Sequence, residues 1–300
     1  MKNKIILTTV SAFFILHSAF AQGSLTPPGA PAPTMKTLDQ IEARTPISAV
    51  PFTITQPGSY YLTTNLVWSS NVSGIDVGNI SEVTIDLNGF SLRNTNVVSI
   101  LKRAISINGV AGQQVTVRNG FITGATNGIS GIGINDGNLG SVLVEDVHCY
   151  TVYSGISLNN GQARNIVRHC SVENAGYRGI VADVVTGCTV RNTFSDGISA
   201  STVTDCQVIQ TSGIGSGITY DGNVGIVVNS IGVSIGGTGI NGTAVANSHG
   251  RSTSGTGIFA YNANNCTGYR TSGTAISATV ANGCYAFSGT NIITFKYNMP

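Results

Sequence analysis

The apolar residues of the chain are mostly small or β-branched and fall at alternating positions, in short stretches separated by Gly, Asn, Ser and Thr. Such alternation is typical of strands with one buried face. Gly-Ile pairs recur at Gly155, Gly179, Gly197, Gly217, Gly239 and Gly257, and Ala275-Ile276 follows them. Successive pairs lie 24, 18, 20, 22, 18 and 18 residues apart. A period of this length predicts an all-β solenoid in which each turn of the chain stacks on the next.

A cysteine or serine marks a second position of the repeat, eight residues after the isoleucine of most pairs. Cys188, Cys206, Ser248, Cys266 and Cys284 show this spacing directly. We assign Cys149 and Cys170 to the same position, and two states stay open for these cysteines. They form either a buried ladder of free thiols or disulfides such as Cys149 with Cys170. Residues that favour turns precede this position, and we expect them to shape a bend: Asp205, Asn229, Asn247 and Asn265.

Other repeat folds lack their signals in this chain. Helical repeats need long amphipathic stretches, and calcium-binding rolls need Gly-Gly-x-Gly-x-Asp. A left-handed hexapeptide coil needs an aliphatic residue every six positions, but steps of six from Ile198 give Thr204 and Gln210. The Gly-Ile-x-Ala strands are followed by Val-Thr-Asp-Cys (203–206) and Val-Ala-Asn-Gly-Cys (280–284). In these motifs the chain resembles the right-handed parallel β-helix proteins of the pectin-lyase-like superfamily.

The resemblance covers about residues 36–300 and extends to both ends of that range. Thr37–Leu62 and Lys296–Pro300 are similar to the corresponding parts of uncharacterised exported bacterial β-helix proteins. The resemblance implies a right-handed parallel β-helix and no agreed activity. We expect roughly ten coils spaced by about 4.8 Å, with Phe287, Phe295 and Tyr297 plugging the C-terminal end. A capping-box pattern at Thr37 and Gln40 predicts a short helix that closes the N-terminal end.

The N-terminal segment predicts export. Residues 1–21 combine Lys2 and Lys4, an apolar run and the small-x-small sequence Ala19-Phe20-Ala21, as a cleaved signal peptide does. Residues 22–35 form a linker rich in Pro and Ala, and residues 36–300 form a single β-helix domain. We therefore expect a periplasmic, extracellular or cell-surface protein that keeps no transmembrane segment once the signal is removed.

Charge narrows the classes of partner. Only 9% of the residues are charged, and 38 of the 300 are glycine. Loss of Lys2 and Lys4 lowers the basic count from 15 to 13, which equals the acidic count, so the mature net charge is 0. This balance excludes the basic surface of a nucleic-acid-binding protein. The expected partner is polysaccharide or cell-envelope material.

Residues 145–191 hold most of the chemistry-bearing side chains. A polysaccharide lyase needs a base near the C5 proton and a cation to neutralise the uronate. The residues that would serve such an enzyme are Arg164, Arg168, Tyr177, Arg178 and Asp183. Calcium would enter only under this alternative. The plainer interpretation is a solvated face of ion pairs. His148 and His169 are assigned to equivalent repeat positions, but two imidazoles without a third ligand predict no metal site.

Two motifs are similar to those of the superfamily's glycoside hydrolases. They are Ser195-Asp196-Gly197 and Ser248-His249-Gly250. Hydrolysis requires two carboxyl groups at a set separation, and the paired aspartates between these motifs are missing here. We therefore give this alternative little weight.

Hydroxyl side chains recur immediately before the Gly-Ile or Ala-Ile pairs. The row consists of Ser216, Thr238, Thr256 and Thr274. Such a neutral face suits sugar hydroxyls, ordered water or a second solenoid, and we treat these four as the candidate ligand-binding residues. Non-catalytic binding of extracellular polysaccharide, or a structural role at the cell surface, is the function that the sequence favours without a cofactor. The alternative is a polysaccharide lyase or glycoside hydrolase.

Overall fold

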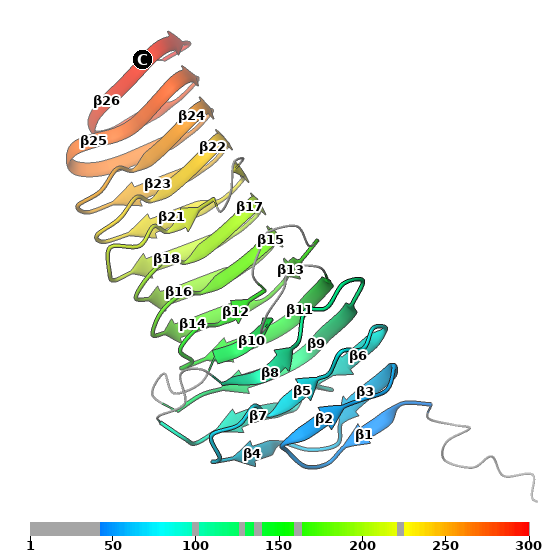
Figure 1. The fold of residues 1–300 in the computed structure, drawn as a ribbon. Helices are drawn as coiled ribbons and strands as arrows, with labels where there is room; N and C mark the ends of the chain where they lie inside the picture. The colour runs from blue at the N-terminus through cyan, green and yellow to red at the C-terminus, as the bar shows by residue number, and fades with distance from the viewer. Residues whose placement is uncertain are drawn as a thin grey trace, which may run out of the picture. The chain divides into compact units, whose positions relative to one another are not determined.

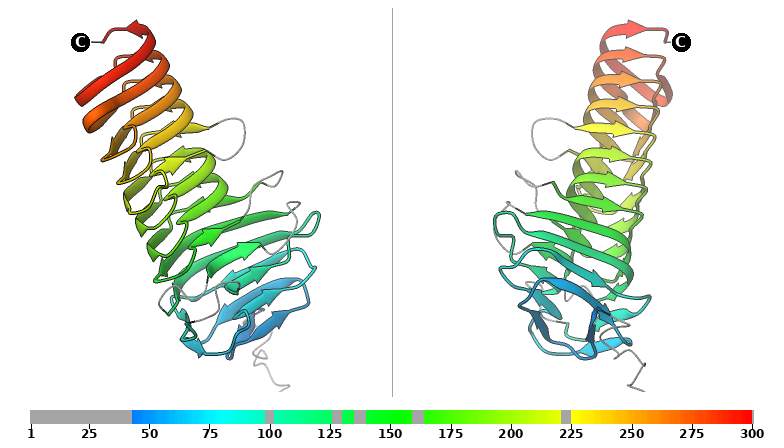
Figure 2. Two further views of the ribbon diagram at one scale, coloured as in Figure 1. Left: turned by 60° about the vertical axis from the view of Figure 1, so that its left-hand side comes forward. Right: turned by 90° about the vertical axis from the view of Figure 1, so that its right-hand side faces the viewer.

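The chain forms a stack of parallel β-strands with no other regular structure in the part described. The computed structural model describes residues 43–97, 102–125, 130–134, 140–158, 164–220 and 225–299. Every strand pairing within these ranges is parallel, as Figures 1 and 2 show. The predicted all-β parallel solenoid is therefore confirmed. The expected signal peptide, the linker and the capping helix at residues 37–41 lie outside the described residues.

The strands form three columns that run along the stack (Figure 1). Column A contains β2 (Phe52–Ile54), β5 (Ile75–Val77), β8 (Arg103–Ile107), β10 (Ser130–Ile134), β12 (Ile156–Ser157) and β19 (Ile218–Thr219). Column B contains β1 (Thr45–Ile47), β3 (Gly58–Leu62), β6 (Val83–Asp86), β13 (Ile166–Arg168) and β20 (Ile226–Val228). Column C contains β4 (Leu66–Trp68), β7 (Ser91–Asn94), β14 (Ser171–Ala175), β16 (Thr189–Thr193), β18 (Gln207–Thr211), β21 (Ile231–Ser234) and β23 (His249–Ser252).

Longer strands bend and serve more than one column. Columns A and B share β15 (Ile180–Thr186), β17 (Ile198–Thr204), β22 (Ile240–Ala246) and β24 (Ile258–Asn264). Columns B and C share β9 (Gln114–Thr123) and β11 (Ser141–Tyr150). Two strands, β25 (Thr267–Asn282) and β26 (Tyr285–Tyr297), contribute to all three columns. Each column thus stacks equivalent residues of successive coils.

A ladder of isoleucines fills the interior of column A. It consists of Ile75, Ile105, Ile132, Ile156, Ile180, Ile198, Ile218, Ile240, Ile258 and Ile276, all completely buried. Burying one such side chain contributes about 1.5–3 kcal/mol. The glycine before the isoleucine lets coils approach, because an added Cβ at Gly179 would lie 2.3 Å from the carbonyl oxygen of Gly197. The Gly-Ile repeat of the sequence therefore marks the core, and the ladder continues three coils further toward the N-terminus.

The bend between columns B and C is made by residues in the left-handed region. Asp205, Asn229, Asn247 and Asn265 have φ between 48° and 53° there. Asn and Asp accept this conformation more readily than other residues with a side chain. Gly187 and Gly283 take the same place in their coils with φ of 62° and 61°. The predicted role of these polar residues in shaping a bend is confirmed.

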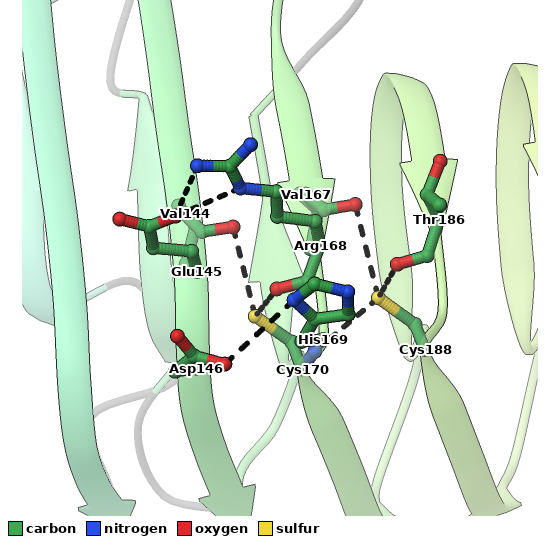
Figure 3. A network of polar contacts seen from close by, with 9 residues as sticks. All are labelled: Val144, Glu145, Asp146, Val167, Arg168, His169, Cys170, Thr186 and Cys188. Carbon is green, nitrogen blue, oxygen red and sulfur yellow. Dashed lines mark hydrogen bonds and ion pairs between the residues drawn. The ribbon is translucent and has the colours of Figure 1, made fainter.

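The cysteine or serine after this bend completes the hydrogen bonding between coils. The backbone N–H of Cys188 donates to the Sγ of Cys206 at 3.4 Å. The N–H of Cys206 donates to the Oγ of Ser230 at 3.2 Å, and that of Ser230 to Ser248 at 3.1 Å. Each thiol or hydroxyl also donates to the carbonyl two residues before it, as Cys170 and Cys188 do in Figure 3. Serine can take the place of cysteine in this ladder, because the Oγ of serine and the Sγ of cysteine can each donate and accept a hydrogen bond.

All six cysteines are buried free thiols, and five of them belong to this ladder. Cys149 does not, because it pairs in register with Ile122 and Val172 inside column C. Its assignment to the same repeat position is wrong, and the ladder place in its coil is held by Val147, next to Gly120 of the preceding coil. The coil that follows Cys149 is longer than the two coils after it, so the sequence interval between Cys149 and Cys170 does not reflect equivalent positions.

The expected plug at the C-terminal end is also wrong. Phe287, Phe295 and Tyr297 are 67%, 54% and 56% exposed. Ile293 and Met299 pack against the core instead. These three aromatic side chains therefore lie on the surface and do not cover the core.

We expect Cys206→Ala to lower the free energy of unfolding by about 1–3 kcal/mol, because the buried N–H of Cys188 loses its acceptor. Cys206→Ser should cost less, since Oγ can replace Sγ as Ser230 and Ser248 already do. Urea denaturation of the two variants measures the difference. Equal losses would mean that only the volume of the side chain matters.

We expect six reactive thiols per chain after denaturation without reductant, and none at pH 8 in the folded protein. Burial raises the pKa of Cys149 from 9.0 to about 12, and the hydrogen bond with Cys170, together with burial, raises that of Cys188 to about 12. Stability that depends on these neutral thiols is present below pH 9 and is lost as the pH rises toward 12. Titration with a thiol reagent checks the count. Fewer than about one thiol per denatured chain would establish disulfides instead.

Candidate functional site

A continuous row of polar residues runs along the edge of column A, one residue before each Gly-Ile or Ala-Ile pair. We call it the polar row, and it consists of Ser73, Arg103, Ser130, Ser154, Arg178, Asp196, Ser216, Thr238, Thr256 and Thr274. Backbone hydrogen bonds between neighbouring coils keep it in register. The N–H of Gly197 donates to the carbonyl of Ser216 at 3.0 Å, and the N–H of Gly217 donates to that of Thr238 at 2.9 Å. The four hydroxyl residues predicted from the sequence therefore stack, and they continue into charged residues.

The middle of the polar row holds an arginine and a carboxylate, and two tyrosines lie beside them. Arg178 lies with its Nε 3.7 Å from Asp196 Oδ2, and the other carboxylate oxygen accepts the N–H of Ser216 at 2.9 Å. The guanidinium also lies over the ring of Tyr177, 5.2 Å from its centroid. Tyr177 stacks on Tyr153 with 5.6 Å between the ring centroids. Arg178 Nε is buried and donates no hydrogen bond to any described residue. The side chain as a whole is 39% exposed, so the rest of the guanidinium can reach a ligand.

The N-terminal end of the polar row opens into a hollow of about 480 Å³. Asp76 of β5 lies inside it, between Thr53 and Ser106 on the neighbouring strands. Lys102, next to Arg103 of the row, lines the same hollow. Neither Asp76 nor Lys102 pairs its side chain with any residue in the described ranges. The volume lies within the range of small-molecule sites, and the two side chains leave opposite charges available.

Pro51, Phe52 and Val72 form the apolar part of the wall of this hollow. The rest of its lining is hydroxyl or charged. A ligand that presents hydroxyl groups on its edge and C–H groups on its face fits such a lining. The ring of a sugar residue has this character.

The C-terminal half of the polar row is neutral and is held by buried hydroxyls beneath it. Ser252 accepts the N–H of Gly255 at 2.8 Å and donates to the carbonyl of Gly237. Ser234 makes the equivalent bond with Gly237 N–H at 2.9 Å. These bonds fix the tight turns that present Thr238 and Thr256 half-exposed. The hydroxyl groups of this half can donate and accept along the whole edge.

The five residues proposed for catalysis fall into three separate places. Arg178 belongs to the polar row, and Tyr177 lies beside it with its ring against the guanidinium. Arg168 lies in column B, where its Nε donates to Glu145 Oε2 at 2.7 Å (Figure 3). Arg164 lies at the edge of column B and lines a different hollow, with Gln114 and Ser141.

Asp183 accepts the backbone N–H of Asn165 at 2.8 Å, so it lies beside Arg164 in the neighbouring coil. It lies between the column A and column B parts of β15, five residues along the chain from Arg178. A lyase would need its base and its cations around one proton. The five side chains do not surround a common point in this way.

The charges of column B are arranged as an alternating ladder. In register from coil to coil it reads Asp86, Arg118, Glu145 and Arg168. Asp86 accepts from Arg118 at 3.2 Å and lies 3.4 Å from Arg44. These contacts form a face of ion pairs along column B, of which only the pair of Glu145 and Arg168 lies within residues 145–191.

The assignment of His148 and His169 to equivalent positions is wrong. His148 pairs in register with Phe121 and Ser171, and its Nδ1 lies 2.6 Å from the Ser171 hydroxyl. His169 is at the bend and lies 3.9 Å from Asp146 (Figure 3). Within the described ranges no three His, Cys, Asp or Glu residues cluster as metal ligands. Asp196 and His249 of the hydrolase-like motifs also belong to different columns.

Sequence reasoning missed the N-terminal half of the polar row. The sequence pattern gives no role to Asp76 and Lys102, and it does not connect Arg103, Ser130 and Ser154 to the threonines. The sequence does contain the pattern that reveals this half, because Gly74-Ile75 and Gly131-Ile132 repeat the Gly-Ile pair of the later coils. Longer loops in these coils break the regular spacing that revealed the later part of the row.

The chain matches no protein-family model, no curated protein and no solved structure. The part that the structure describes also contains no helix of the length and apolar character that a membrane crossing requires.

We expect Arg168→Gln to change the free energy of unfolding by less than about 1 kcal/mol, because its pair with Glu145 is exposed to solvent. Asp86→Asn should cost about 1–3 kcal/mol, since Asp86 is buried and accepts from Arg118 and from the N–H of Asn88. Urea denaturation at low and high salt compares the two variants. The reverse order would show that the exposed end of the ladder is the stabilising one.

Proposed function

We propose that the protein binds an extracellular polysaccharide along the polar row without cleaving it. The observation that carries the proposal is the stack of hydroxyl, guanidinium and carboxylate residues from Ser73 to Thr274, of which Ser154 alone is buried. With coils about 4.8 Å apart, the row spans about 43 Å. A polymer that repeats its hydroxyl groups can meet donors and acceptors at each coil.

The two ends of the row have different tasks under this proposal. The hollow with Asp76 and Lys102 holds one sugar residue, with Phe52 and Val72 against its apolar face. The central pair, Arg178 and Asp196, fixes the orientation of the chain through charged hydrogen bonds, which contribute about 1.5–3 kcal/mol each. Ser216 and the threonines that follow it support the rest of the polymer. No cofactor takes part.

The context that we propose for this binding is the cell envelope or the space outside it. The signal-like sequence of residues 1–21 supports export. We also infer that the stack is right-handed, since parallel strands are almost always connected in that hand. A place in the pectin-lyase-like superfamily rests on the repeat motifs of the sequence. Its lyase and hydrolase activities remain the alternative function, and calcium would belong to that alternative.

We expect Arg178→Gln to raise the dissociation constant for the bound polysaccharide about tenfold, because one charged hydrogen bond is lost. Asp76→Asn should weaken binding as well, since the hollow loses its carboxylate. Arg168→Gln is the matched control, because it removes a charge that lies off the row. Affinity electrophoresis in gels that contain neutral or acidic polysaccharides measures all three. Equal retardation of wild type and both row variants would overturn the proposed location.

The same polysaccharides test whether the protein is an enzyme. We expect no release of unsaturated products or new reducing ends, with or without calcium. Product release that is abolished by Arg178→Gln would replace the binding function with catalysis at the polar row. Release that is abolished by Arg168→Gln or Arg164→Gln would place catalysis in column B.

A further inference from the structure

The last strand of the stack, β26, has one edge without a neighbour in the described part of the chain. On its other side it pairs with β25. The first pair joins Tyr285 to Thr267, and the last joins Tyr297 to Asn282. Alternate N–H and C=O groups along its 13 residues therefore point away from the stack. An edge of this kind is a template for another strand.

The side chains of β26 give this edge little protection against such pairing. Five large apolar or aromatic residues are between 50% and 67% exposed along it: Tyr285, Phe287, Ile292, Phe295 and Tyr297. Lys296 is the one charged residue between Arg270 and Pro300 in the sequence. Proteins usually protect long edge strands with several charges, prolines or a covering segment.

The sequence of β26 is self-complementary when read in the opposite direction. With Asn291 at the centre of an antiparallel pairing, Tyr285 lies opposite Tyr297 and Phe287 opposite Phe295. Ser288 then lies opposite Thr294. Aromatic pairs across two strands stabilise a sheet. Each of these pairs would occur twice in a symmetric pair of chains.

The path of β26 through the three columns matches the same symmetry. Its residues 285–288 extend column C, with a register shift that leaves Phe287 unpaired with β25. Residues 291–293 extend column A and 295–297 extend column B. A two-fold axis through Asn291 passes through the column A segment and exchanges the two flanking segments. The end of one stack can therefore superimpose on the end of another.

From these features we propose that β26 pairs antiparallel with β26 of a second copy about a two-fold axis through Asn291, which joins two stacks end to end. The side-chain oxygen of Asn291 is buried and has no hydrogen-bond partner among the described residues. On the axis, the same amide of the second copy supplies a donor. The contact is isologous, so it closes at two copies. The polar row lies on the edge of column A and is not covered by it.

One residue opposes this association. Lys296 pairs in register with Ala281, which is buried inside column B, so the lysine occupies an inward position at the open end. In the paired state it would lie opposite Ala286 of the second copy, and removal of its ammonium group from water is unfavourable. Lys296 thus weakens the contact and makes it reversible.

Sedimentation velocity of the full chain over a range of concentrations tests the proposal. We expect a monomer–dimer equilibrium, and Phe295→Lys should raise the dissociation constant of the dimer at least about tenfold, because it removes two aromatic pairs and adds two charges. Phe194→Lys is the matched control, since Phe194 is 61% exposed and lies far along the chain from β26. Lys296→Met should lower the dissociation constant. A monomer at every concentration, or equal effects of Phe295→Lys and Phe194→Lys, would overturn the proposal.

Cross-linking tests the register separately from the affinity. Asn291→Cys should form a disulfide between two copies under mild oxidation, because the two residues meet on the axis. Thr294→Cys alone should not, whereas a mixture of Thr294→Cys and Ser288→Cys should. Circular dichroism confirms that each variant keeps the β-solenoid. Cross-linking of Thr294→Cys with itself in preference to Asn291→Cys would rule out this pairing.

Discussion

Each coil has to turn from column B to column C while it keeps its backbone hydrogen bonds to the next coil, and the fold depends on how that corner is made. A residue in the left-handed region, such as Asn247, turns the chain from one column into the next. The N–H that follows would then be left without a carbonyl acceptor inside the protein, which is costly. The Sγ or Oγ atom one coil further on accepts it, as Ser248 does for Ser230. Repetition of this bond keeps successive coils in one register.

A constant register has consequences at the other edge of column A. Because the isoleucines stack without slipping, the residue before each Gly-Ile pair also stacks. One polar residue per coil is then enough to build a linear surface from residues far apart in the sequence. Arg178 and Asp196 meet for this reason, although 18 positions separate them. The polar row is therefore a direct product of the repeat, and no long loop is needed to assemble it.

The sequence was informative where the coils are short and regular. The Gly-Ile spacing predicted the core from Ile156 onward, and the serines at 230 and 248 predicted the ladder at the bend. The same reasoning failed where a loop is inserted. The repeat positions assigned to Cys149 and His148 are wrong by two residues. Inserted loop residues change the spacing along the sequence, but they do not change the pairing register between strands. The hollow around Asp76 could not be predicted at all, since it depends on which side chains of three neighbouring coils face outward together.

Binding of a polymer along the polar row is the central functional claim, and mapping the contact surface tests it most directly. Backbone amide NMR of the chain, titrated with oligosaccharides from a polysaccharide that retards it in gels, reports which residues respond. The account predicts shifts at the polar row from Ser73 to Thr274, with the largest near Arg178 and Asp76. Shifts confined to column B around Arg168 and Glu145 would contradict it.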